Sequence, residues 1–156
     1  MDIHIFGTKN KKLIRELTES AEFFAGILLD PRMARNIELD IEINKKLDVE
    51  GHCVCEDERK NPRFFTIELR NKRTDEDVFK TLAHEMVHVK QYAKNQLYKR
   101  FGLSRRGITL ENVWEGNVWK PKRAEHKYFD SPWEIEAYGR EIGLYQRWLE
   151  YKNNVN

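Results

Sequence analysis

Apolar residues recur at intervals of three and four over residues 11–29, which predicts an amphipathic helix near the N-terminus. Its apolar face consists of Leu13, Leu17, Ala21, Phe24 and Leu28. The pair Asp30-Pro31 should end this helix, because the residue before a proline disfavours the helical conformation. The chain therefore begins with a helix that has one face for a core.

The period changes to two after this helix, as expected for strands that are buried on one face. Three strands are predicted: one with Ile37, Leu39, Ile41 and Ile43 on its inner side, one with Cys53 and Cys55 on one side, and one over residues 63–70. The turn pair Asn61-Pro62 precedes the third strand. These segments predict a small sheet of three or four strands.

Helical periodicity returns at residue 74 and predicts a long helix to about residue 100, which Thr74 and Asp77 begin in the manner of a capping box. Residues 101–131 are predicted to be irregular, with a possible hairpin over 108–119. Ser131-Pro132 should begin a final helix that reaches about residue 151. This order predicts one α+β domain that covers residues 1–156.

Composition narrows the class of protein further. Hydrophobic residues make up 40% and charged residues 35% of the 156 residues, and the net charge is +2. So small a net positive charge does not predict a nucleic-acid partner. No apolar run is long enough for a membrane span, and the N-terminus lacks the apolar run of a signal peptide. Two cysteines do not form a disulfide framework. We therefore expect a monomeric cytoplasmic protein.

The residues with the clearest chemistry are His84, Glu85 and His88, which form an HExxH motif within the long predicted helix. Positions four apart on a helix project from the same side, so two imidazoles can converge on one metal ion. Glu85 can then reach a water on that metal without being a ligand. The apolar stripe of this helix lies opposite, so we expect both histidines to face a cleft or solvent. A solvated helix face is the alternative interpretation of the same spacing.

Zinc requires a third protein ligand. A histidine in the longer motif HExxHxxGxxH is excluded, because Gln91 and Lys94 occupy the required positions. The final helix offers Glu134, Glu136 and Glu141 instead.

Periodicity separates these three glutamates. Glu134 shares an inward stripe with Ala137 and Glu141, whereas Glu136 lies on a polar stripe where it can pair with Arg140. We therefore predict Glu134 as the ligand and Glu136 as the alternative. Glu134 also fits a helix cap with Ser131, which would need no metal.

These two motifs resemble the glutamate-liganded zinc metallopeptidases, the gluzincins. HEMVH on one helix is followed by E-x-x-A, from Glu134 to Ala137, on a second. The size is similar to that of minimal zincin domains of the ImmA/IrrE and SprT-like types, and the segment PWEIEAYGRE is similar to small peptidase-like proteins of bacteriophages. The family often has Asp or Asn after the alanine, where this chain has Tyr138. Glu141 could take over the role of orienting a metal-binding histidine.

The resemblance implies a minimal zincin-like fold that binds one Zn²⁺ through His84, His88 and Glu134. It implies peptide hydrolysis with Glu85 as the general base and a peptide or protein as substrate. An extended peptide would add to the strand at residues 63–70, and His126, Tyr128 and Tyr138 are candidates for stabilising the oxyanion. The alternative function is a zinc-containing binding module with weak activity, acting on a host regulatory or DNA-associated protein.

Overall fold

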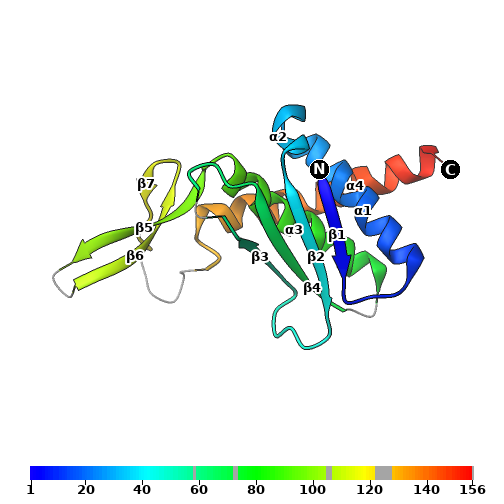
Figure 1. The fold of residues 1–156 in the computed structure, drawn as a ribbon, viewed down its shortest axis with the longest axis horizontal. Helices are drawn as coiled ribbons and strands as arrows, with labels where there is room; N and C mark the ends of the chain where they lie inside the picture. The colour runs from blue at the N-terminus through cyan, green and yellow to red at the C-terminus, as the bar shows by residue number, and fades with distance from the viewer. Residues whose placement is uncertain (58, 72–73, 105–106, 122–127, 156) are drawn as a thin grey trace.

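The helices and strands form a mixed α/β body from which a second, smaller sheet projects at one end (Figure 1). The structure is a computed structural model, and it describes residues 1–57, 59–71, 74–104, 107–121 and 128–155. In chain order its elements are β1 (Asp2–Phe6), α1 (Lys11–Leu28), α2 (Pro31–Arg35), β2 (Glu38–Asn44), β3 (Gly51–Cys55), β4 (Phe64–Arg70), α3 (Asp75–Ala93), β5 (Leu97–Ser104), β6 (Gly107–Trp114), β7 (Asn117–Val118) and α4 (Pro132–Val155). The predicted α+β class is confirmed.

The main sheet has the strand order β1-β2-β4-β3. β1, β2 and β4 run parallel, whereas β3 pairs antiparallel with β4 and lies at an edge. β1 was not predicted, although Ile3 and Ile5 alternate with polar residues. Its parallel pairing with β2 is a long-range contact, which the periodicity of a short segment does not reveal.

The hydrophobic core lies on one face of this sheet, where α1 and α3 pack. The odd-numbered residues of β2 and β4 are buried there, which is the period-two pattern expected for a half-buried sheet. α4 packs against α3. α3 therefore lies between the sheet and α4, and its residues from Leu82 to Gln91 are all buried.

Capping residues determine where the helices begin. Asn10 precedes α1 and its side-chain oxygen accepts hydrogen bonds from Lys12 N and Leu13 N. Thr74 caps α3 by accepting from Asp77 N at 3.4 Å, as the sequence predicted. In the described part of the chain, no helix is both long and apolar enough to cross a membrane.

The predicted extension of the long helix to residue 100 is wrong. α3 ends at Ala93, and Asn95 has a φ of 56°, a left-handed conformation that asparagine tolerates better than most residues. Gln96 N then donates to Gln91 O at 2.8 Å, which closes the helix end. The chain continues into β5, so Leu97 belongs to a strand and not to the predicted helix.

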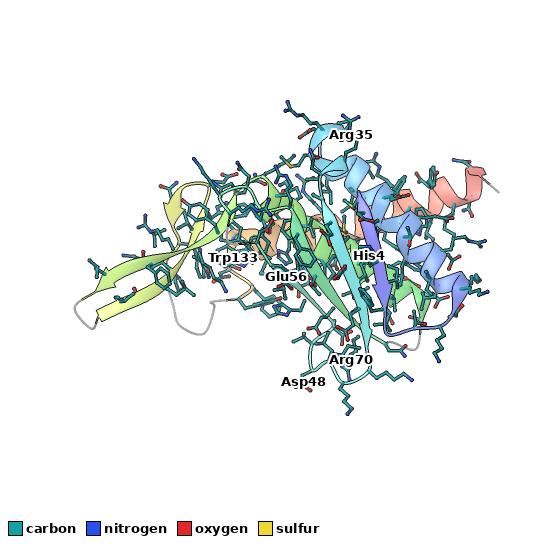
Figure 2. All side chains as sticks on the ribbon, viewed as in Figure 1. His4, Arg35, Asp48, Glu56, Arg70 and Trp133 are labelled. Atoms are coloured by element: carbon teal, nitrogen blue, oxygen red, sulfur yellow. The ribbon has the colours of Figure 1, made fainter. Side chains whose placement is uncertain are left out.

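The segment predicted to be irregular contains most of a second sheet, with the strand order β5-β6-β7. The predicted hairpin corresponds to β6 and β7, which turn at Glu115 and Gly116, both with positive φ. Figure 2 shows Trp133 at the start of α4, where this sheet joins the body. Its ring lies 6.5 Å from Trp114 and 5.0 Å from Trp119, so aromatic packing attaches the second sheet to α4.

Candidate metal centre

α3 places His84, Glu85 and His88 inside the molecule and not on its surface. Their exposed fractions are 6%, 5% and 8%. The expectation that both histidines face a cleft or solvent is therefore wrong for His88 and only partly right for His84, which lines a cleft at one side. The physical reason is that α4 covers the polar stripe of α3, which gives the helix a buried surface on two sides.

α4 brings Glu134 to the two histidines. Its Oε2 lies 3.4 Å from Nε2 of His84, and its Oε1 lies 3.5 Å from Nε2 of His88. The two Nε2 atoms are 3.2 Å apart. Among the described residues, these three side chains form the one group of histidine, cysteine and acidic residues whose potential ligand atoms all converge.

The distances between these atoms fit a zinc ion. In a tetrahedral site with zinc–ligand bonds of about 2.0–2.2 Å, neighbouring ligand atoms lie roughly 3.3–3.5 Å apart. The two Nε2 atoms, at 3.2 Å, and the pair of Oε2 of Glu134 with Nε2 of His84, at 3.4 Å, are close to this range, and the other carboxylate oxygen of Glu134 lies 3.5 Å from Nε2 of His88. Oε2 of Glu134 is also buried without a hydrogen-bond partner among the described residues. A buried carboxylate oxygen without a hydrogen bond is costly, and a cation between it and the two imidazoles would satisfy it.

The surroundings favour a charged Glu134. Burial by itself would raise its pKa, but the adjacent imidazoles of His84 and His88 outweigh burial and lower the pKa to about 2. Glu134 is thus an ionised carboxylate at neutral pH, the form that binds a metal.

The pKa of Glu85 is shifted in the opposite direction to that of Glu134. Burial raises the pKa of its carboxyl above the ordinary value, and the two histidines oppose this only in part. A carboxylate with a raised pKa is a stronger base, which suits a group that accepts a proton during a reaction. Glu85 lines the same cleft as His84.

Each histidine is held by a partner on its other ring nitrogen. Nδ1 of His84 lies 2.9 Å from Oε2 of Glu141, which is the residue proposed from the sequence for this role. Nδ1 of His88 lies 2.8 Å from Oε1 of Gln91. Such partners select the tautomer that leaves Nε2 free to bind a metal. Gln91 was missed, because the sequence used this position only to exclude a third histidine.

Gln91 also connects the site to α4. Its side chain is fully buried, and its Nε2 donates to Trp133 O at 2.9 Å and to Oε2 of Glu136 at 3.1 Å. The predicted pair of Glu136 with Arg140 is present at 2.9 Å, but Glu136 also accepts from Lys90 at 2.6 Å. Glu136 therefore packs against α3 and is not on an open solvent face, yet it does not lie with the two histidines.

The alternative role of Glu134 as a helix cap is not supported by the contacts. Ser131 N donates to Tyr128 O at 3.1 Å, and Ser131 Oγ donates to the same carbonyl at 2.6 Å. The carboxylate of Glu134 is directed toward the histidines. The carboxylate of Glu134 therefore lies with the histidines and not at the N-terminus of α4 as a cap.

The cleft beside His84, His88 and Glu134 has a volume of about 460 Å³ and opens beside His84 and Glu85. Tyr128 and Tyr138 line it, and the ring of Tyr138 lies 4.6 Å from that of His84. Burial and the nearby Glu134 raise the pKa of both phenols, so their hydroxyls stay protonated and can donate hydrogen bonds. His126, the third candidate for the oxyanion, lies outside the described residues.

The strand predicted to accept a peptide is the wrong one. β4, which contains most of residues 63–70, is paired on both sides and has no free edge. β3 is the edge strand next to β4, and its first residue, Gly51, lines the cleft. A Cβ on Gly51 would lie 2.7 Å from Oε1 of Glu85, so the edge strand passes directly against the predicted base.

The two cysteines of β3 pack in the hydrophobic core or against it. Cys53 is buried in the core cluster, and burial raises its pKa well above the ordinary value. Sγ of Cys55 donates to Asp57 O at 3.3 Å. Both are free thiols.

Comparison with known proteins does not assign this site to a family. No protein-family model, no curated protein and no solved structure gives a significant match to the chain.

Proposed function

We propose that this protein is a zinc-dependent peptidase that binds one Zn²⁺ through His84, His88 and Glu134. The observation that carries the proposal is the convergence of two imidazole nitrogens 3.2 Å apart with the buried carboxylate of Glu134, whose Oε2 lies 3.4 Å from Nε2 of His84 and whose Oε1 lies 3.5 Å from Nε2 of His88. Two nitrogens and one oxygen are a common zinc ligand set, and three protein ligands leave a coordination position open. An open position is the property of catalytic sites, whereas structural sites are closed by a fourth ligand.

The metal and the side chains would have different roles in the reaction. Zinc, when bound, would polarise a peptide carbonyl and lower the pKa of a water molecule to about 7. Glu85 accepts the proton of the attacking water and passes it to the leaving amine. Tyr128 and Tyr138 line the cleft and can donate a hydrogen bond to the oxygen that becomes negative.

The substrate we propose is a peptide or protein in extended conformation. β3 is an edge strand that runs past Glu85, and an extended peptide can pair with such an edge through main-chain hydrogen bonds. This pairing would place a peptide bond in the cleft beside His84 and Glu85 without requiring a particular side chain.

We also propose a minimal zincin-like fold and a cytoplasmic location. The first is supported by the order of a helix, a sheet with an antiparallel edge strand, a helix with HExxH and a later helix with the glutamate. The second is supported by two unpaired cysteines, which suit a reducing compartment.

The test of the proposed function is the variant Glu85→Gln. It should bind zinc with the affinity of the wild type but cleave an unfolded protein such as reduced casein about 10²–10⁴-fold more slowly. Glu50→Gln is the matched control, because Glu50 lines the same cleft but is assigned no role in the reaction. Equal cleavage by wild type and Glu85→Gln would exclude Glu85 as the base, and a wild type that binds zinc but cleaves nothing would favour the binding module.

A further inference from the structure

The projecting hairpin of β5 and β6 has one strongly apolar face. Register pairs Phe101 with Leu110 and Leu103 with Ile108, so these four side chains lie together on one side. Their exposed fractions are 80%, 60%, 90% and 73%. Below, the name apolar hairpin face refers to these four residues.

The other side of the same hairpin is polar. Arg100 pairs with Glu111 at 3.2 Å, and Gly102 lies opposite Thr109. Large apolar side chains on one face of a hairpin that only contacted water would be unfavourably hydrated. Contiguous exposed apolar surface of this kind marks a binding surface.

The apolar hairpin face is continuous with the proposed substrate path. Phe101 and Leu110 line a second hollow of about 600 Å³, together with Cys53, Val54 and Cys55 of β3. The same strand lines the cleft at Glu85 through Gly51. One edge strand therefore leads from the predicted base to the apolar hairpin face.

We infer that the apolar hairpin face is a remote part of the substrate-binding surface, which binds apolar side chains of an extended polypeptide lying along β3. This inference rests on the proposed peptidase function. It specifies the substrate class as unfolded or extended polypeptide with a cluster of apolar residues at a set distance from the cleaved bond.

The length of β3 gives that distance. Paired strands advance together at roughly 3.3 Å per residue. Because Gly51 and Cys55 are the two ends of β3, a peptide residue opposite Cys55 lies about four residues from the one opposite Gly51. Residues about four to eight positions from the cleaved bond would reach the apolar hairpin face.

The experiment compares a short and a long substrate of the same cleavage site. Cleavage sites in reduced casein are mapped by mass spectrometry. The site that is cleaved fastest is synthesised as a core peptide of six residues and as two longer peptides, one with an apolar segment added at the N-terminal end and one with it added at the C-terminal end. The test variant is the double substitution Phe101→Ser and Leu103→Ser. The matched control is Arg100→Ser with Thr109→Ser, on the polar face of the same hairpin.

We expect the test variant to cleave the core peptide like the wild type, and the better long peptide with a KM about tenfold higher and an unchanged kcat. The control should match the wild type on every peptide. The normal rate on the core peptide shows that the test variant is folded. If the test variant cleaves the long peptides as well as the wild type does, the inference is overturned and the proposed function stands.

Two further measurements separate the remaining outcomes. If the wild type cleaves neither casein nor any peptide, the proposed function fails, and the anisotropy of labelled reduced casein with the zinc-loaded wild type then tests the hairpin alone. Casein binding that is about tenfold weaker with the Phe101→Ser and Leu103→Ser changes supports the inference, and equal or absent binding overturns it. Sedimentation of the wild type as a dimer that the test variant converts to a monomer would also overturn it, because the face would then bind a second copy.

Discussion

Gln91 offers a test of how the site is held, because its buried side chain connects His88, a proposed zinc ligand, to α4. In Gln91→Leu the side chain keeps a similar size but loses the acceptor for Nδ1 of His88, which now lies at 2.8 Å. Removing such a partner lowers metal affinity 10–100-fold in other sites, which corresponds to about 1.4–2.7 kcal/mol. Loss of the hydrogen bond to Trp133 O should cost about 1–3 kcal/mol of folding free energy in addition.

Gln91→Glu separates these two effects. A carboxylate can still accept from His88, so zinc affinity should stay within about threefold of the wild type. The donors to Trp133 O and to Glu136 are lost, and two carboxylates would face each other where 3.1 Å now separates Nε2 of Gln91 from Oε2 of Glu136. The metal-free variant should therefore unfold at lower urea than the wild type.

The assays are competition against a chromophoric zinc chelator and urea unfolding of the metal-free protein. The reasoning would be refuted if Gln91→Leu bound zinc like the wild type. Equal losses of zinc affinity in the leucine and glutamate variants would also refute it, because Gln91 would then serve only the packing of the helices.

Three further substitutions test other parts of the structure. Gly51→Ala places a Cβ against Cγ2 of Thr81 and 2.7 Å from Oε1 of Glu85, so kcat should fall about tenfold to a hundredfold while zinc binding is retained; an unchanged kcat would show that the strand can move aside. Glu141→Ala removes the partner 2.9 Å from Nδ1 of His84 and should weaken zinc binding at least about tenfold in the chelator assay; no change would remove its orienting role. Gly139→Ala adds a methyl group with nothing within 4 Å inside α4, so the melting temperature should rise by about 2–4 °C in calorimetry, and a fall would contradict the helix geometry there.

The sequence predicted the elements whose signal is local. HExxH depends only on helical spacing, and the periodicity of α4 alone separates Glu134 from Glu136, without the contact between α3 and α4. Strands with alternating apolar residues were found within a residue of their observed limits, as in β2 and β4.

The features that were missed depend on contacts between distant segments. β1 is a strand because it pairs with β2, and the order of strands that makes β3 an edge is a property of the whole sheet. The end of α3 depends on the left-handed conformation of Asn95, which periodicity does not detect. The partnership of Gln91 with His88 and α4 required the packing of two helices far apart in sequence.

The central claim is most directly tested by zinc analysis of three proteins: the wild type, Glu134→Gln and Glu136→Gln. After dialysis against trace zinc, the wild type and Glu136→Gln should each retain one equivalent of zinc per chain. Glu134→Gln should bind zinc at least about a hundredfold more weakly in chelator competition, because two imidazoles alone would remain. Equal zinc retention by Glu134→Gln and the wild type, or a wild type that binds no zinc, would contradict the proposed metal centre.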